Sequence, residues 1–369
     1  MKRKDAKFEP AGIPKRIFAA RRLRSPRPSA KNLRLTLALA ALAFAFAHSA
    51  ISSPALSIGP KPLKKVGVIE LPGPAGKPFG SLALDPQTHL LFCAHADAGS
   101  LYVVDVMSGK WKETIPGLPG VRGVAFAEGL RKIYASVSGE DSIAVMDSTT
   151  LRVVKTIPTE ASPGAMTYAA PFGKLFVSDE VAGALAVVDT QRDAVVNMIR
   201  FGGRVGTPQF DPAAQRVYVN LPGANEIAAV DPATEMLLSR NPVGRCKGNT
   251  GMALDPDRGL AFLACEENNL LAVYDLRSNQ VLDYLPMAAG GANVALDRSL
   301  GRVYVACVSG AISVYEEEKA GRCRKMCDYS AAHAVHSLAV DPATHRIYVP
   351  EQEEDGVPVA RLVVYEARQ

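Results

Sequence analysis

The sequence predicts an all-β fold: a seven-bladed β-propeller of four-stranded antiparallel blades, closed by the N-terminal strand. One unit of about 40 to 45 residues returns seven times, which is typical of propeller blades. Three markers repeat in register, and the first is the acid that ends one segment, spaced by 42, 42, 42, 44, 41 and 50 residues: Asp105, Asp147, Asp189, Asp231, Asp275, Glu316 and Glu366. The second is an aromatic residue: Phe92, Tyr134, Phe176, Tyr218, Phe262, Tyr304 and Tyr348. The third lies ahead of the aromatic: Asp85, Ala127, Ala169, Asp211, Asp255, Asp297 and Asp341.

Each unit divides into four short segments, here lettered A to D from the centre of the propeller outward. Segment A reads LALD at 82–85 and VALD at 294–297, segment B carries the aromatic, and segment C ends in the acid. Segment D is represented by VVKTIP at 153–158 and VLDYLP at 281–286. Runs of β-branched and aromatic residues between Asp, Pro, Gly and Asn turns indicate strands.

The two ends of the repeat region predict how the ring closes. The last unit stops at LVVYEARQ (362–369), which is a segment C with no segment D after it. Residues 66–73 read VGVIELPG, and their Leu-Pro pair matches the Ile-Pro or Leu-Pro that ends segment D elsewhere. We therefore expect 66–71 to pair with 361–366 and complete the last blade. Joining first and last strands removes two free sheet edges.

The N-terminal region has a different composition. Residues 1–34 are rich in Lys and Arg, residues 35–47 form an apolar run, and small residues follow at Ala47, Ser49 and Ala50. This order is typical of a secretory signal. The sequence therefore predicts a signal at 1–50, a linker at 51–63 and the propeller at 64–369, with export to a bacterial periplasm or beyond. An uncleaved N-terminal anchor stays open; after cleavage we expect no membrane span.

The positive charge of the chain belongs to this leader. Residues 1–50 contain twelve Lys or Arg and two Asp or Glu, whereas the whole chain carries a net charge of +5. The remaining residues therefore carry −5. A domain of that charge has no bulk attraction for phosphate backbones, so nucleic acid is not an expected partner.

Six cysteines are expected to meet an oxidising compartment,. Folding the hairpin about DPDRG (255–259) places Cys265 opposite residue 250, close to Cys246, so a Cys246–Cys265 disulfide is predicted. Cys323 and Cys327 lie on an expected outer strand, where residues four apart are about 13 Å apart; only a looped conformation would join them. Cys93 and Cys307 are expected to be buried thiols.

The repeats resemble those of the YncE-like, YVTN-repeat β-propellers. The residues that carry the resemblance are RVYVN at 216–220, RVYVA at 302–306 and RIYVP at 346–350. The resemblance implies an exported propeller. Some family members bind single-stranded DNA, and related propellers act as quinoprotein partners, lactonases or lyases. The family supplies no catalytic residues that match positions here.

The sequence contains no strong catalytic motif, and no cofactor is predicted. Neither H-E-x-x-H nor G-x-S-x-G nor a phosphate loop is present,. The D–A and B–C loops of a propeller surround one mouth of its central channel, and three histidines fall on such loops: His95, His333 and His336. They are candidate ligands for a divalent metal, although lone histidines on loops are more often only solvated.

Departures from the repeat give a second set of candidates. Five residues before each segment-A marker the blades carry mainly Gly, Ala or Thr, but blade 2 has Arg122 and blade 7 has His336. Nearby polar residues are Asn293, Thr250 and Asn249. Small residues leave room at the axis, and an arginine fork beside hydroxyl and amide groups suits a carboxylate or another small anion. The alternative is that Arg122 and His336 plug the channel or pair with acids of the B–C loops: Glu140, Asp141, Glu353 and Glu354.

The resulting functional expectation is a monomeric binding or scaffold protein whose channel mouth receives a small ligand or a protein. The alternative is an enzyme of the lactonase or lyase type that uses a metal or a histidine at the same mouth.

Overall fold

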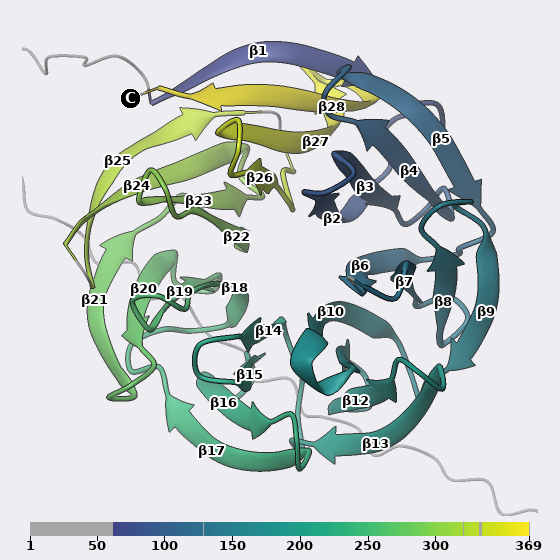
Figure 1. Ribbon diagram of the computed structural model, residues 1–369. Helices are drawn as coiled ribbons and strands as arrows, with labels where there is room; N and C mark the ends of the chain where they lie inside the picture. The colour runs from purple at the N-terminus through teal and green to yellow at the C-terminus, as the bar shows by residue number, and fades with distance from the viewer. Residues whose placement is uncertain (1–61, 128, 320, 332–333, 369) are drawn as a thin grey trace, which may run out of the picture. The chain divides into compact units, whose positions relative to one another are not determined.

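The computed structural model describes residues 62–127, 129–319, 321–331 and 334–368, which form seven four-stranded antiparallel sheets in a ring (Figure 1). This confirms the predicted seven-bladed propeller. The predicted signal (1–50) and residues 51–61 of the predicted linker lie outside the described residues. Within the described part, no helix is long and apolar enough to cross a membrane.

The first four blades follow one another along the chain. Blade 1 contains β2 (Phe79–Asp85), β3 (Leu90–His95), β4 (Ser100–Asp105) and β5 (Lys110–Pro116). Blade 2 contains β6 (Val121–Ala127), β7 (Lys132–Val137), β8 (Ser142–Asp147) and β9 (Val153–Pro158). Blade 3 contains β10 (Pro163–Ala169), a 3₁₀ turn (Ala170–Phe172), β11 (Lys174–Asp179), β12 (Ala184–Asp189) and β13 (Ala194–Arg200). Blade 4 contains β14 (Pro208–Asp211), β15 (Arg216–Leu221), β16 (Glu226–Asp231) and β17 (Met236–Pro242).

The last three blades complete the ring. Blade 5 contains β18 (Asn249–Asp255), β19 (Leu260–Cys265), β20 (Leu270–Asp275) and β21 (Gln280–Pro286). Blade 6 contains β22 (Gly291–Asp297), β23 (Arg302–Cys307), β24 (Ala311–Lys319) and β25 (Arg322–Ser330). Blade 7 contains β26 (Ala339–Asp341), β27 (Arg346–Glu354), β28 (Val357–Ala367) and β1 (Leu63–Glu70).

The ring closes through the N-terminal strand, as predicted. In Figure 1 the purple β1 lies beside the yellow β28 at the rim. Its register pairs Val68 with Val363 and Glu70 with Arg361, and the pairing begins at Leu63 rather than at residue 66. The first and last parts of the chain therefore share one sheet.

The hydrophobic core lies between blades rather than within them. Seven clusters of buried residues among the described ones each join two neighbouring blades. Between blades 2 and 3, for example, Tyr134 and Val145 pack with Leu175 and Val188. Because second and third strands are covered on both faces, their sequences are continuous apolar runs rather than alternating ones. Each fully buried side chain of this size contributes about 1.5–3 kcal/mol, so radial packing dominates stability.

The repeated acids at the ends of the third strands cap the turns that follow. The Asp105 carboxylate accepts hydrogen bonds from the backbone N–H groups of Met107 (2.9 Å) and Ser108 (3.1 Å). The same contacts recur at Asp147, Asp189 and Asp231. These hydrogen bonds hold the pKa of all four carboxyls below the usual value,. The marker that revealed the repeat is a structural cap.

Basic residues at the start of second strands tie neighbouring blades together at the same end of the sheets. This end, which carries the A–B and C–D turns, is called the turn face below. Lys132 Nζ lies 2.8 and 2.9 Å from the carboxylate oxygens of Asp193 in the next blade. Lys174 Nζ lies 2.7 Å from Glu235 of blade 4. Both lysines are mostly buried, so these contacts link the blades.

The predicted disulfide is present. Cys246 and Cys265 are bonded, with Cα atoms 5.2 Å apart, and the hairpin register places Asn249 opposite Cys265. Cys93 and Cys307 are buried thiols, as expected. Cys323 and Cys327 lie on the extended outer strand β25, with Cys323 a buried free thiol.

Candidate functional site

The opposite end of the blades, called the mouth face, contains a cavity of about 620 Å³ at the channel. Residues from the start of the innermost strands, and from the B–C loops of blades 1 and 3, line it. They include Gly80, Ser81, Asp97, Arg122, Gly123, Gly164, Glu180, Thr207, Gln209, Asn293, His336 and Ser337. The volume lies in the range of small-molecule sites, about 300–1,000 Å³.

Hydroxyl and amide groups around the axis join the blades to one another. Each bond runs from one innermost strand or its preceding loop to the next: Ser337 Oγ to Gly80 O (2.6 Å), Ser81 Oγ to Arg122 O (2.7 Å), Thr207 Oγ1 to Thr250 O (3.0 Å), Thr250 Oγ1 to Gly291 O (3.2 Å) and Leu338 N to Asn293 Oδ1 (3.2 Å). These groups satisfy backbone polar atoms that the narrow axis leaves without a ladder partner. Their first role is therefore structural.

The glycines at the axis permit close approach of neighbouring strands. A Cβ atom added at Gly123 would lie 2.2 Å from the carbonyl oxygen of Gly164, and one added at Gly80 would lie 2.8 Å from the carbonyl oxygen of Arg122. No side chain fits at such distances, so glycine is required by packing. Gly80 and Gly123 therefore allow neighbouring innermost strands to approach closely beside the cavity.

The five residues expected at the mouth fall into two groups. Arg122, His336 and Asn293 line the cavity. Asn249 is fully buried, and its Nδ2 donates to Asn220 Oδ1 (3.1 Å) and to the backbone oxygen of blade 4 at residue 226 (2.8 Å). Thr250 donates to the next blade as described above. Asn249 and Thr250 therefore connect blades 4, 5 and 6.

Arg122 is a loosely paired cation in the cavity lining. Its side chain is 47% exposed, and its Nη1 lies 3.7 Å from Glu180 Oε2, too far for a hydrogen bond,. Glu180 belongs to the B–C loop of blade 3 and also lies 4.0 Å from Arg204 Nε. None of the four acids named in the predicted alternative (Glu140, Asp141, Glu353 and Glu354) is paired with Arg122; its nearest acid is Glu180, and Glu354 pairs with Arg361.

The charges at the mouth balance one another, with two guanidinium groups on one side. Arg122 and Arg204 share the single carboxylate of Glu180, while Lys77 lies 3.8 Å from Asp97. These three cations and two acids are joined by a third acid, Glu266, whose charge acts on His336. Exposed pairs at such distances bind weakly, about 0–1 kcal/mol, so a ligand can displace them.

His336 contributes a neutral imidazole to the cavity wall. Although part of its surface is open, desolvation lowers its pKa, and the negative charge of Glu266 opposes this only in part. A neutral imidazole offers one donor and one acceptor nitrogen. His336 can therefore hydrogen-bond a ligand or accept a proton at neutral pH.

His95 does not face the channel as the metal hypothesis requires. It is fully buried and stacks on Phe79 with ring centroids 4.3 Å apart. Its Nε2 lies 3.2 Å from the backbone oxygen of Lys77, and its Nδ1 lies 3.1 Å from the Tyr102 hydroxyl. A carbonyl only accepts, so Nε2 donates and Nδ1 accepts from Tyr102. Both nitrogens are used within blade 1 and its preceding loop.

The remaining metal candidates do not form a described site. His333 lies outside the described residues. Among the residues the structure does describe, no group of three or more His, Cys, Asp or Glu side chains could hold a metal ion.

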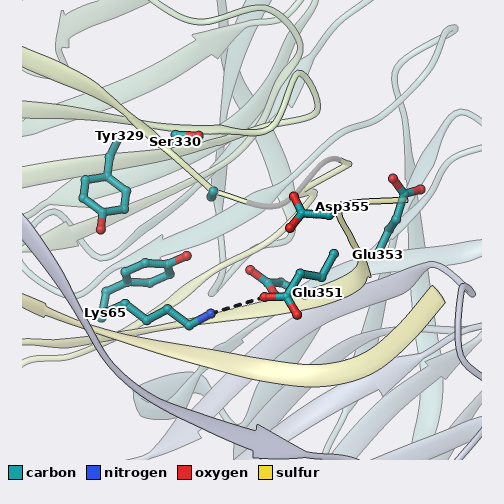
Figure 2. Close-up of a pocket in the computed structure, with 9 residues that line it drawn as sticks. Lys65, Tyr329, Ser330, Glu351, Glu353 and Asp355 are labelled. Atoms are coloured by element: carbon teal, nitrogen blue, oxygen red, sulfur yellow. Dashed lines mark ion pairs between the residues drawn. The ribbon is translucent and has the colours of Figure 1, made fainter. Parts of the chain in front are cut away.

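A second cavity, of about 360 Å³, lies between blades 6 and 7 (Figure 2). Its lining combines Lys65 from β1, Tyr329 from β25 and four acids from the β27–β28 hairpin: Glu351, Glu353, Glu354 and Asp355. Sequence reasoning treated two of these acids only as loop charges. The 50-residue spacing between the last two closing acids was the signal of an enlarged hairpin here.

Comparison with known proteins adds no assignment. The chain matches no known family model, and no curated protein matches it. The propeller fold stands on the strand geometry described above, and any functional conclusion has to come from the cavities.

Proposed function

We propose that this chain is an exported binding propeller of the YncE-like kind whose channel mouth holds a small ligand bearing a carboxylate. One observation carries the proposal: the half-exposed Arg122 guanidinium lines the 620 Å³ cavity with no hydrogen bond to its nearest acid, Glu180, at 3.7 Å. A planar guanidinium with unused donors is suited to bidentate binding of a carboxylate.

Neighbouring groups complete the anion site. Asn293 accepts a backbone hydrogen bond through Oδ1, so its Nδ2 amide group remains to donate toward the cavity,. The neutral His336 adds a further donor on the same wall. Arg122 and Arg204 share the one carboxylate of Glu180, so this side of the mouth favours an anion over a cation.

Export is part of the proposal. The Cys246–Cys265 disulfide supports it, because such bonds persist in oxidising compartments and are rare in the cytosol,. The basic and apolar leader sequence supports it independently. We propose that the exported protein works as a monomer and that its partners do not include nucleic acid.

A second candidate function rests on His336. Its lowered pKa keeps the imidazole ready to accept a proton at neutral pH, which a lactonase or lyase would use as a general base,. This enzymatic alternative predicts turnover of a lactone that is lost in His336→Gln, whereas the binding proposal predicts retention of ligand without turnover.

The proposal is tested by calorimetric titration of small carboxylates, beginning with succinate, into the purified protein and two arginine variants. Arg122→Met should weaken binding about 10- to 100-fold, since a hydrogen bond to a charged group contributes about 1.5–3 kcal/mol. Arg192→Met is the control, because Arg192 is 77% exposed on the turn face. Equal affinity of all three proteins would place the carboxylate elsewhere and overturn the proposal.

A further inference from the structure

The second cavity, which shares no lining residue with the channel mouth, is built by a departure from the repeat. The second strands of blades 1 to 6 have six residues, but β27 has nine and β28 continues for eleven. The hairpin turns at Asp355 and Gly356, both with positive φ. This extension supplies Glu353, Glu354 and Asp355 of the cavity, and Glu351 is the last residue of the ordinary six-residue length.

The resident cations are concentrated on two of the four acids. Arg361 Nε and Nη2 lie 3.0 and 2.9 Å from Glu351 Oε2, and Nη2 lies 2.5 Å from Glu354 Oε1. Lys65 Nζ lies 3.7 Å from that same Glu354 oxygen (Figure 2). Glu353 and Asp355 form no ion pair with another described residue. Four carboxylates and two cations give the cavity a formal charge of −2.

Aromatic rings form the other wall. Tyr329 and Tyr365 meet edge to face with centroids 5.4 Å apart, and both line the cavity. In the view of Figure 2, Tyr329 lies on the side opposite Glu353 and Asp355. Tyrosine faces attract cations, and more strongly where water is excluded. The cavity thus offers carboxylates at one end and rings at the other.

The Tyr365 side chain is buried for the most part, and its hydroxyl has no protein hydrogen-bond partner in the described chain. The residue is 3% exposed, and its hydroxyl forms no hydrogen bond with another described residue. Burial raises the pKa of Tyr365, so the hydroxyl stays protonated and can both donate and accept. The hydroxyl oxygen is not fully enclosed by protein, so it is reachable from the cavity that Tyr365 lines. It can therefore hydrogen-bond a group that enters the cavity.

We propose that this cavity binds a small organic dication of the alkyl diamine class, one ammonium at Glu353 and Asp355 and the other at Tyr365 and the rings. A ligand with two positive charges would neutralise the formal charge of −2 in the cavity. The acids spread along a hairpin rather than converging, which suits an extended dication better than a metal ion. Lys65 already places an alkylammonium against Glu354.

The test is calorimetric titration of 1,4-diaminobutane at neutral pH and low salt. We expect saturable one-to-one binding, with n-butylamine at least about tenfold weaker because it lacks the second charge. The double variant Glu353→Gln, Asp355→Asn should weaken the diamine at least about tenfold, and Tyr365→Phe about 3- to 10-fold, as for one neutral hydrogen bond. Glu113→Gln, an exposed acid on β5, is the matched control and should bind as the parent protein does.

Three results would overturn this assignment. They are no saturation at millimolar diamine, equal affinity in the double variant, and stoichiometric displacement of the diamine by MgCl₂, which would assign the acids to a metal. The melting temperatures of all variants, measured alongside, establish that they remain folded. Failure of the carboxylate site at Arg122 does not affect these outcomes, because the two cavities share no lining residue.

Discussion

On the turn face, Lys132 is mostly buried and lies 2.8 Å from Asp193, whereas on the mouth face Arg122 is half exposed and lies 3.7 Å from Glu180. Both residues are cations near an acid of the next blade. The lysine belongs to a motif that recurs from blade to blade; the arginine breaks a pattern of small residues. Residues that repeat hold the ring together, and residues that depart from the repeat remain free to bind.

The largest expected effect comes from removing the closing strand. Deleting residues 63–71 would expose the edge of β28 and lose the burial of Leu63, Ile69 and Leu71. At about 1.5–3 kcal/mol per side chain this loss approaches the whole stability of a domain, about 5–15 kcal/mol. We expect no cooperative unfolding transition by circular dichroism. Deletion of residues 51–60 is the control; a truncated protein that melted like this control would show that closure is not needed.

The next effect concerns the disulfide between the loop entering blade 5 and strand β19. Replacing both Cys246 and Cys265 by Ala should cost about 3 kcal/mol, as for a loop of this length, and lower the melting temperature by about 6–12 °C. A reducing agent should shift the parent protein similarly and leave the variant unchanged. If the reducing agent shifted the variant as much as the parent, another bond would be responsible.

A smaller loss of stability is expected when Lys132, which links blades 2 and 3, is replaced. Lys132→Met leaves Asp193 partly buried without its cation, which should cost about 1.5–3 kcal/mol in the free energy of unfolding. Arg122→Met should cost about 0.5 kcal/mol or less, since its pair is exposed and loose. Chemical denaturation measures both. Equal losses would remove the distinction between the two faces.

The smallest expected effect is the contribution of His95 to the pH dependence of the protein's stability. Burial lowers its pKa in the folded protein, so the unfolded chain binds a proton first as the pH falls through about 6.5,. The contribution of His95 to stability is therefore complete above that pH and declines below it. Melting temperatures between about pH 7.5 and about pH 5.5 should fall less steeply in His95→Gln. An unchanged slope in this variant would contradict a neutral His95.

The features readable from the sequence were local or periodic. The three markers predicted seven blades because each reports a strand or turn set by neighbouring residues. The disulfide followed from counting across one hairpin. The structural roles of Thr250 and Asn249 could not be predicted from the sequence. Their hydrogen-bond partners lie in neighbouring blades, and which partner is reached depends on the direction of the side chain. The cavity between blades 6 and 7 was not predicted from the sequence. Its residues Lys65, Tyr329 and Glu353 are far apart in the chain and meet only once the ring is closed.

The central claim is tested most directly by measuring succinate affinity and melting temperature together for Arg122→Met and Lys132→Met. The account predicts a crossed result: the Arg122 variant loses at least about tenfold in affinity but melts like the parent, while the Lys132 variant melts lower but binds normally. A result in which Arg122→Met melts as low as Lys132→Met, with both variants losing the same affinity, would contradict it.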